Sequence, residues 1–450
     1  MKCMKRRRIP NTNLKGMGQK TGFLCLFSID RMDFMEEKVP CIIIGAGAAG
    51  LMAAGVLAEH GKKAVVLEKN HHAARKLLIT GKGRCNLTNC CDIPEFLENV
   101  AAGGRFLYSA LSRFSPYDTM AFFENRDVAL KVERGQRVFP QSDKAADIAD
   151  ALLRYAQGGD NRIWYDCAVK SLLFENGAVQ GVVLADGQKL FSKNVLVCTG
   201  GKSYPGTGST GDGYLFAKQA GHQVNPPVPS LIPLVIRESF CKDAQGLSLR
   251  NVSLKAVDGK TGKTVFEELG EMLFTHFGVS GPLVLSASCH MRPMEPGRYR
   301  LYLDLKPGLN EQQLDARLQR DFEKYHNRDF INALSDLLPR KFIGVMVHES
   351  GIPGGQKVNQ ITKQQRQAFC RLLKAFPMTV EGMRPIQEAI ITSGGVELKE
   401  IHPKTMESKL APGLYFAGEV LDTDAYTGGF NLQIAFSTAR AAADAIGQTW

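Results

Sequence analysis

Short apolar runs separated by glycine-rich turns begin after residue 38. Cys41–Ile44 is entirely apolar, Gly45–Gly50 is rich in glycine and alanine, and Leu51–His60 has the composition of a helix. A second apolar run follows at Ala64–Leu67. Runs this short and this apolar are typical of buried parallel strands. The pattern therefore predicts a strand–helix–strand unit at the start of a domain.

The remaining chain changes its pattern twice. Strand-like alternation dominates 162–197 and 234–306, with the hairpin signal Asn176-Gly177 between two strands, whereas 310–375 is richer in helix-forming residues. Four prolines within Pro226–Pro233 mark a crossing between domains. Apolar Leu414–Ala417 and alanine-rich Asn431–Ile446 predict a last strand and a long helix.

These patterns predict an α/β fold: a Rossmann-like domain of the dinucleotide-binding type with an inserted β-rich domain and a small helical piece. The predicted divisions are 1–38, a disordered or mis-annotated extension; 39–225, the first part of the dinucleotide-binding domain; 226–375, the insert; and 376–450, the C-terminal return.

The glycine turn after the first strand has the spacing Gly45-x-Gly47-x-x-Gly50. Gly45 permits a tight turn, Gly47 lets the backbone approach a pyrophosphate, and Gly50 lets the helix pack closely on the strand. Glu68 ends the second strand, where a carboxylate accepts hydrogen bonds from ribose hydroxyls. The combination predicts a dinucleotide site.

A second match, Gly206-x-Gly208-x-x-Gly211, follows Pro205 and lacks an acid-terminated strand at the right distance. We therefore expect a ligand-facing loop there rather than a second nucleotide fold.

Charge and cysteine usage limit the class of protein. The net charge is +11, and seven basic residues without an acid lie in the first twenty positions. This tail is read as an extension, with contact to nucleic acid or an anionic membrane as the alternative. The eleven cysteines form no C-x-x-C pair, which favours reduced thiols in a cytoplasmic protein. His71–His72 lacks companion ligands, so no metal site is expected.

A C-terminal segment distinguishes FAD from NAD as the bound nucleotide. The strand Leu414–Ala417 runs into Gly418-Glu419, and Thr427–Asn431 opens the final helix. FAD is longer than NAD: its ribitol needs an acceptor such as Glu419, and a helix N-terminus stabilises charge at the flavin pyrimidine. We expect the backbone at Asn431 and Leu432 to face that end.

Four motifs carry a family resemblance: Ile43–Gly50, Lys76–Asn89, Gly270–Gly278 and Phe416–Glu419. From about residue 39 onward the chain resembles the two-dinucleotide-binding flavoprotein superfamily and, within it, the aminoacetone-oxidase-like or BaiN/YhiN-like flavoproteins. The resemblance implies a FAD domain interrupted by a β-rich insert and a helical piece, and it places the loop Thr80–Asn89 beside the flavin. The predicted cofactor-binding residues are Gly45, Gly47, Ala48, Ala49, Gly50, Glu68, Lys69, Lys76, Gly81, Gly83, Arg84, Cys85, Asn86, Gly200, Gly418, Glu419, Asp422, Gly429, Asn431 and Leu432.

The candidate catalytic residues are Arg84, His276 and Tyr426, and each has an alternative role. Arg84 belongs either to the flavin loop or to a polar surface loop. His276, between Phe274 and Phe277, is either a packed residue or a proton donor. Tyr426 either contacts substrate or is structural. Cys85 is expected to be a packed, unreactive thiol rather than a nucleophile.

The resemblance implies two activities: reduction of C=C bonds in 3-oxo bile-acid or steroid intermediates with NAD(P)H as donor, or oxidation of a small amine such as aminoacetone by O₂. Thr210–Gly213 resembles a segment of the fumarate reductases and ketosteroid dehydrogenases, which favours C=C reduction. The expected partner is a small molecule, without a membrane. An RNA-associated flavoprotein is a second alternative, suggested by the basic tail. The sequence leaves the oligomeric state open.

Overall fold

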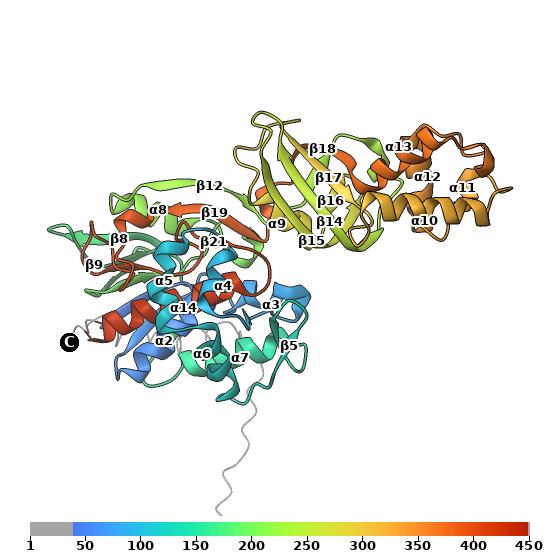
Figure 1. Cartoon of the computed structure of the whole chain (residues 1–450). Coiled ribbons are helices and arrows are strands. Elements are labelled where there is room, and N and C mark those ends of the chain that lie inside the picture. Colours follow the sequence, from blue (N-terminus) through green and yellow to red (C-terminus); the bar gives the residue numbers. More distant parts are fainter. Residues whose placement is uncertain (1–38, 449–450) are drawn as a thin grey trace, which may run out of the picture.

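The computed structural model describes residues 39–448, which form two lobes (Figure 1). The predicted extension 1–38 lies outside the described residues. The sheet lobe combines the N-terminal and C-terminal parts of the chain, and the barrel lobe is formed by residues 234–383. Each lobe has its own apolar core. The chain therefore leaves the sheet lobe, builds the barrel lobe and returns.

A parallel sheet of five strands forms the centre of the sheet lobe, in the order β20-β11-β1-β2-β7. Its neighbouring strands are all parallel. Strands β1 and β2 are buried along their whole length, as expected for a parallel sheet covered on both faces. The five strands are β1 (Cys41–Ile44), β2 (Ala64–Leu67), β7 (Arg162–Trp164), β11 (Val195–Val197) and β20 (Leu414–Phe416).

Helices surround this sheet, and the C-terminal helix α14 packs against α2, so that helices from the first and last parts of the described chain lie side by side (Figure 1). Alanine is the most frequent residue of α2, and its small side chain suits close packing of two helices. The helices of the sheet lobe are α2 (Ala48–Glu59), α3 (Arg75–Ile79), α4 (Ile93–Glu98), α5 (Gly104–Arg113), α6 (Pro116–Glu124), α7 (Ala145–Ala156), α8 (Asp212–Gln219) and α14 (Phe430–Gln448).

Smaller sheets complete the lobe. The predicted Asn176-Gly177 hairpin is present between β8 and β9, with φ values of 52° and 82° that its tight turn requires. The remaining strands are β3 (Thr88–Asn89), β4 (Val100–Ala102), β5 (Leu130–Glu133), β6 (Arg137–Pro140), β8 (Val169–Glu175), β9 (Ala178–Leu184), β10 (Lys189–Phe191), β12 (Val224–Ser230), β19 (Ile391–Val396) and β21 (Asp424–Ala425).

The barrel lobe is a closed six-stranded barrel in the order β13-β16-β15-β14-β17-β18. Its pairings are antiparallel, which fits the strand-like alternation of this part of the sequence. Helix α9 (Pro282–Ser288) packs on β15. The strands are β13 (Leu234–Ile236), β14 (Ser248–Asp258), β15 (Thr264–Thr275), β16 (Gly278–Ser280), β17 (Tyr299–Asp304) and β18 (Phe376–Met383).

A helical piece extends from the far side of the barrel, away from the sheet lobe (Figure 1). It contains α10 (Glu311–Lys324), α11 (Phe330–Ala333), α12 (Arg340–Ser350) and α13 (Lys363–Lys374). Strand β18 lies beyond the predicted end of the insert at residue 375, yet it pairs with β13 and β17 of the barrel. A local sequence pattern cannot predict that a strand pairs with strands far away in the sequence. The predicted boundary at residue 375 is therefore too early.

A two-stranded ribbon, β12 with β19, lies where the chain passes between the lobes. Three of the prolines that mark the predicted crossing belong to β12, a strand with one partner, where a missing N–H is tolerated. The sheet, the barrel and the helical piece confirm the predicted fold class. No helix within residues 39–448 combines the length and apolarity needed to cross a bilayer.

Candidate cofactor and substrate site

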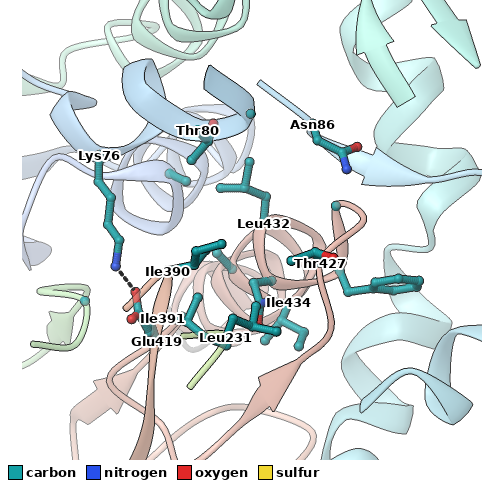
Figure 2. A pocket seen from close by; sticks show the side chains of 18 of the residues that line it. Lys76, Thr80, Asn86, Leu231, Ile390, Ile391, Glu419, Thr427, Leu432 and Ile434 are labelled. Carbon is teal, nitrogen blue, oxygen red and sulfur yellow. Dashed lines mark hydrogen bonds and ion pairs between the residues drawn. The ribbon is translucent and has the colours of Figure 1, made fainter. Parts of the chain in front are cut away.

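A cavity of about 1240 Å³ lies between the sheet lobe and the barrel lobe. Its lining includes the β1–α2 turn, the end of β2, the loop after α3, the start of α14, and parts of β15 and α9. Figure 2 shows Lys76 paired with Glu419, and a group of apolar side chains, including Leu231 and Ile390, next to Glu419. Pockets for one drug-sized ligand measure about 300–1,000 Å³, so this cavity can hold a longer ligand together with a second molecule.

The glycine turn forms one end of the cavity, with Gly45, Gly47, Ala48 and Ala49 in its lining. A side chain at Gly45 would meet the Cys198 carbonyl oxygen at 2.7 Å, whereas a Cβ at Gly47 has no neighbour within 4 Å and projects into open space. The N-terminus of α2 has neither a capping side chain nor an acid in its first turn. Its free N–H groups are thus available to an anionic ligand.

Gly50 lies behind the turn and does not line the cavity. An added Cβ there would lie 1.9 Å from the Gly45 carbonyl oxygen. Gly50 therefore allows the helix to approach the turn, which is an indirect contribution to the site.

Glu68 lies at the same end of the cavity and is fixed by the surrounding backbone. Its Oε2 accepts a hydrogen bond from the Ala46 N–H at 2.8 Å, and its Oε1 accepts one from the Asn70 N–H at 2.9 Å. The neighbouring Lys69 also lines the cavity, and its ammonium group donates to Asp212 at 2.6 Å. These contacts hold a carboxylate and an ammonium group beside the glycine turn.

The ion pair between Lys76 and Glu419 joins residues that are 343 positions apart, with Nζ and Oε2 separated by 2.6 Å. Glu419 also accepts hydrogen bonds from the Ser203 hydroxyl at 3.1 Å and from the Thr392 N–H at 2.8 Å. Both charged side chains are partly buried, at 23% and 19% exposure. Gly200 and Gly418 line the same region.

The loop Thr80–Asn89 forms another wall, but only part of it faces the cavity. Gly81, Arg84 and Asn86 line the cavity, and Gly83 does not. Cys85 is fully buried outside the lining, and burial raises the pKa of its thiol to about 12. This position fits an unreactive, packed thiol. It does not fit the predicted direct contact of Cys85 with the cofactor.

Helix α14 brings its first residues to the far part of the cavity, where Gly429, Asn431 and Leu432 contribute to the lining. Gly429 has φ 98°, and a Cβ there would lie 2.2 Å from the Thr88 carbonyl oxygen. The Asn431 side chain is engaged with the Ala425 backbone at both its amide atoms. Asp422 points elsewhere: it accepts a hydrogen bond from Asn225 at 2.7 Å and is absent from the lining.

The three catalytic candidates occupy different environments. Tyr426 lines the cavity between the lobes. Arg84 lines it too, but its guanidinium is paired with Glu133 and Asp143, and these hydrogen bonds raise its pKa. His276 is exposed in the turn between β15 and β16, against Phe277 and outside the lining. The structure thus separates His276 from the other two, because the β15–β16 turn carries it away from the cavity.

Several lining residues have no counterpart in the predicted set, including Leu231, Leu269, Met272, Leu285, Ile390 and Ile391. Met272 belongs to the motif Gly270–Gly278, whereas the others are single or paired apolar residues of the barrel lobe and of the segments at the connecting ribbon, which belong to no motif. The motif Gly270–Gly278 was the available signal, since its first residues lie on the cavity side of β15. The predicted ligand-facing loop is present, with Thr207, Gly208 and Ser209 in the lining.

The arrangement fits FAD. Open space at Gly47 and the uncapped α2 N-terminus suit a pyrophosphate, and Glu68 lies where an adenosine ribose needs acceptors. The cavity continues to Glu419 and to the start of α14, as a ligand longer than adenosine diphosphate requires. Within residues 39–448 no cluster of three His, Cys, Asp or Glu side chains has the arrangement of a metal site.

This fold and this cavity define a FAD-binding Rossmann flavoprotein of the oxidoreductase type. More particularly, the chain belongs to the family described as HI0933-like protein Rossmann domain, whose model matches residues 39–445.

Similar proteins with assigned activities cover nearly the whole chain. A 3-dehydro-bile acid delta(4,6)-reductase from Clostridium scindens is 31% identical over 408 residues, covering 88% of this chain and 96% of the relative. A ribosomal RNA dihydrouridine synthase from Haemophilus influenzae is 32% identical over 413 residues, covering 91% and 98%.

Solved structures share the fold at low sequence identity. A 3-ketosteroid-delta4-(5alpha)-dehydrogenase from Rhodococcus jostii has a TM-score of 0.51 at 14% identity, over 92% of this chain and 98% of that one. A flavocytochrome c3 fumarate reductase has a TM-score of 0.50 at 15% identity, over 97% and 82%. At this identity the likeness concerns the fold alone.

Proposed function

We propose that this protein is a FAD-dependent reductase that saturates a C=C bond conjugated to a carbonyl group, with NAD(P)H as the electron donor. The first candidate substrate is a 3-oxo bile acid or a steroid-like molecule. Bound FAD supplies the hydride-donating centre. The residues of this chain then have to bind the conjugated system, exclude water and deliver one proton.

The activities named for the two relatives share this chemistry. A Δ4,6-reductase of 3-dehydro bile acids saturates double bonds in conjugation with a ketone. Dihydrouridine is uridine whose ring C=C bond, conjugated to a carbonyl, has been reduced. Two relatives with such different substrates support the reaction type more strongly than either substrate.

The observation that carries the proposal is an apolar wall with one hydroxyl group. Leu231 and Ile391 are buried in one hydrophobic cluster, against which Leu285, Ile390 and Tyr426 pack, and all five line the cavity. A flat apolar substrate can lie on this wall, and the Tyr426 hydroxyl can then contact one polar group of that substrate. Buried polar groups placed in this way fix the orientation of a ligand in an apolar pocket.

Tyr426 is the proposed proton donor. Burial raises its pKa to about 12, so the hydroxyl remains protonated at neutral pH and can give its proton to the substrate. Arg84 is occupied by two carboxylates, and His276 lies outside the cavity. Of the three candidates, Tyr426 is therefore the one whose position and protonation suit the reaction.

A uracil ring in RNA is the second candidate substrate, and one feature of the cavity favours it. Lys82, Arg134 and Arg137 contribute to the lining, and no salt bridge joins them to a carboxylate within residues 39–448. Cations without a salt bridge suit the phosphates of a polynucleotide.

The test is an anaerobic flavin titration. The purified protein is expected to be yellow, to be reduced by NADH or NADPH, and to be reoxidised by a 3-oxo-Δ4 steroid or by a ribosomal RNA fragment that contains uridine. Reoxidation by one of the two identifies the substrate class. If neither reoxidises the flavin, the proposal is wrong. If aminoacetone with O₂ is then turned over rapidly, the amine-oxidase alternative takes its place.

A first variant tests the donor. Tyr426→Phe removes the hydroxyl and keeps the ring, so we expect the rate of substrate reduction to fall about 10²–10⁴-fold, the usual contribution of a positioned acid. Reduction of the flavin by NAD(P)H and the FAD content are expected to stay unchanged. An unaltered rate of substrate reduction would exclude Tyr426 as the donor.

A further inference from the structure

Tyr426 has a hydrogen-bond partner that comes from the other lobe. His290 follows α9 of the barrel lobe, and its Nε2 lies within hydrogen-bond distance of the Tyr426 hydroxyl, which follows β21 of the sheet lobe. The two ring centroids are 5.6 Å apart at an interplanar angle of 75°. The contact is edge-on, so the ring nitrogen and not the ring face meets the phenol.

The pair is held by a second contact between the lobes. Arg292, two residues after His290, donates to the buried Asp424 at 2.9 Å, and Ser230 donates to the same oxygen at 2.7 Å. The His290 ring also packs against Phe266 of β15, with centroids 5.9 Å apart. These contacts fix both sides of the His290–Tyr426 hydrogen bond, which therefore exists only while the lobes are joined here.

We propose that His290 is the positioning residue of the reaction: it holds the Tyr426 hydroxyl toward the cavity and restores its proton after each turnover. This inference rests on the proposed function. His290 acts through Tyr426 and does not itself line the cavity. The sheet lobe thus supplies the donor, and the barrel lobe supplies the group that keeps the donor in its working state.

The proton balance is complete with solvent as the source. The O–H bond of Tyr426 breaks as a C–H bond forms at the substrate carbon next to the carbonyl. The phenolate then takes the proton from Nε2–H of His290, while Nδ1 of the same ring takes a proton from a solvent water, which becomes hydroxide; this is the one solvent proton that each reduction consumes. The imidazole stays neutral throughout and changes tautomer, and rotation or a second exchange with water resets it. The electron pair of the new C–H bond is that of the enolate left by hydride addition to the substrate, and these proton transfers change no oxidation state.

The charges around the pair favour these protonation states. Burial lowers the pKa of His290, and Arg292 lowers it further, against the opposing effect of Asp424. The imidazole is therefore neutral at neutral pH. Burial and the neighbouring Glu268, Cys289 and Asp424 raise the pKa of Tyr426. A neutral imidazole whose Nε2–H donates to the phenol oxygen leaves the Tyr426 O–H free to point at the substrate.

The experiment compares three variants of the full chain with FAD bound. His290→Phe keeps a ring against Phe266 but removes the nitrogen, His290→Gln keeps a donor, and His276→Gln is the control, because that histidine is exposed in a turn of the same barrel. We expect kcat of His290→Phe to fall about 10–100-fold, with KM and FAD content unchanged. We expect His290→Gln to have a kcat between those of His290→Phe and the wild type, because its amide can still hold the Tyr426 hydroxyl. We expect His276→Gln to match the wild type.

Two further measurements distinguish a relay from a merely structural contact. In His290→Phe the phenolate must be reprotonated directly by solvent, so kcat is expected to fall as pH rises from 7 to 9, whereas wild-type kcat stays level. In ¹⁵N-histidine NMR spectra without substrate, the His290 signals, assigned by their loss in His290→Gln, should show the Nε2–H tautomer and should shift in Tyr426→Phe.

Unchanged kcat and a level pH profile in His290→Phe would overturn the inference, and so would a Nδ1–H tautomer that is indifferent to Tyr426→Phe. These results would leave the proposed function intact as long as Tyr426→Phe still slows substrate reduction. Failure of every enone to reoxidise the wild-type flavin would instead remove the proposed function itself, so the two failures are distinguishable.

Discussion

The dinucleotide end and the Tyr426 end of the cavity differ in the sequence separation of the residues that form them. At the first end, Gly45, Gly47 and Glu68 lie within 24 consecutive residues of one strand–helix–strand unit. At the other end, Tyr426 meets His290 across 136 residues and across two lobes. The first end is thus built by local backbone geometry, and the second by the docking of one lobe on the other.

This difference has a consequence for how each end tolerates change. A glycine turn depends on the absence of side chains, so almost any larger residue disrupts it. The Tyr426 end depends on particular polar groups in a mostly apolar wall, where a change of one atom type alters the chemistry and leaves the packing. Variants should therefore affect cofactor binding at one end and turnover at the other.

The largest expected effect is at Gly47. The protein is expected to fold with a leucine at this position, because a Cβ at Gly47 meets nothing within 4 Å. The leucine side chain would, however, fill the place proposed for the pyrophosphate. We expect Gly47→Leu to be purified as a colourless, folded protein with at least a 100-fold weaker affinity for FAD. The absorbance near 450 nm and circular dichroism measure the two properties.

Gly344→Leu is the matched control for this change. Gly344 lies in helix α12 of the helical piece, and a Cβ there also meets nothing within 4 Å. Stoichiometric FAD is expected in this variant. Stoichiometric FAD in Gly47→Leu as well would show that the ligand lies elsewhere.

A smaller effect is expected at Glu419, which connects three distant parts of the chain through hydrogen bonds from Lys76, Ser203 and Thr392. Glu419→Gln removes the charge and leaves Lys76 without its carboxylate partner. Hydrogen bonds to charged groups contribute about 1.5–3 kcal/mol, so we expect FAD affinity to fall about 10–100-fold in a fluorescence titration.

Glu267→Gln removes a carboxylate from the ion pair with Lys255 on the barrel surface and serves as the control, with no expected effect on FAD. If both variants bind FAD equally well, the Lys76–Glu419 pair has a purely structural role.

The smallest expected effect concerns pH and the sheet lobe. His222 is buried between Glu400 and Ser408, and burial lowers its pKa below the ordinary 6.5. The unfolded chain then binds a proton on this group at a higher pH than the folded chain does, so its contribution to stability is present above pH 6.5 and is lost as the pH falls from 6.5 through the lowered pKa of the folded state. One proton changes the free energy of unfolding by at most about 1.4 kcal/mol per pH unit.

Thermal unfolding between pH 7.5 and 5 measures this effect. We expect His222→Gln to have a lower Tm than the wild type at pH 7.5 and a smaller loss of Tm toward pH 5. An identical pH dependence in the two proteins would show that other groups carry the acid sensitivity.

Local patterns were sufficient for several secondary-structure elements. The apolar runs at Cys41–Ile44 and Ala64–Leu67 are strands with the predicted bounds, because short, fully apolar segments next to glycine have few other stable structures. The hairpin at Asn176-Gly177 is fixed by its turn in the same way. Local reasoning failed at β18, whose partners β13 and β17 are distant in sequence.

The sequence by itself determined the dinucleotide-binding unit, which follows from the spacing of glycines and one acid along a short stretch. It also indicated the β-rich insert, from alternating apolar positions, and FAD, from a second glycine-and-acid segment near the C-terminus. Only the tertiary structure decided which candidates meet. It brought Tyr426 to the cavity, turned His276 to solvent, engaged Arg84 with two carboxylates, and revealed His290. The physical reason is that backbone conformation depends on near neighbours, whereas a hydrogen bond between lobes depends on how two separately packed cores dock.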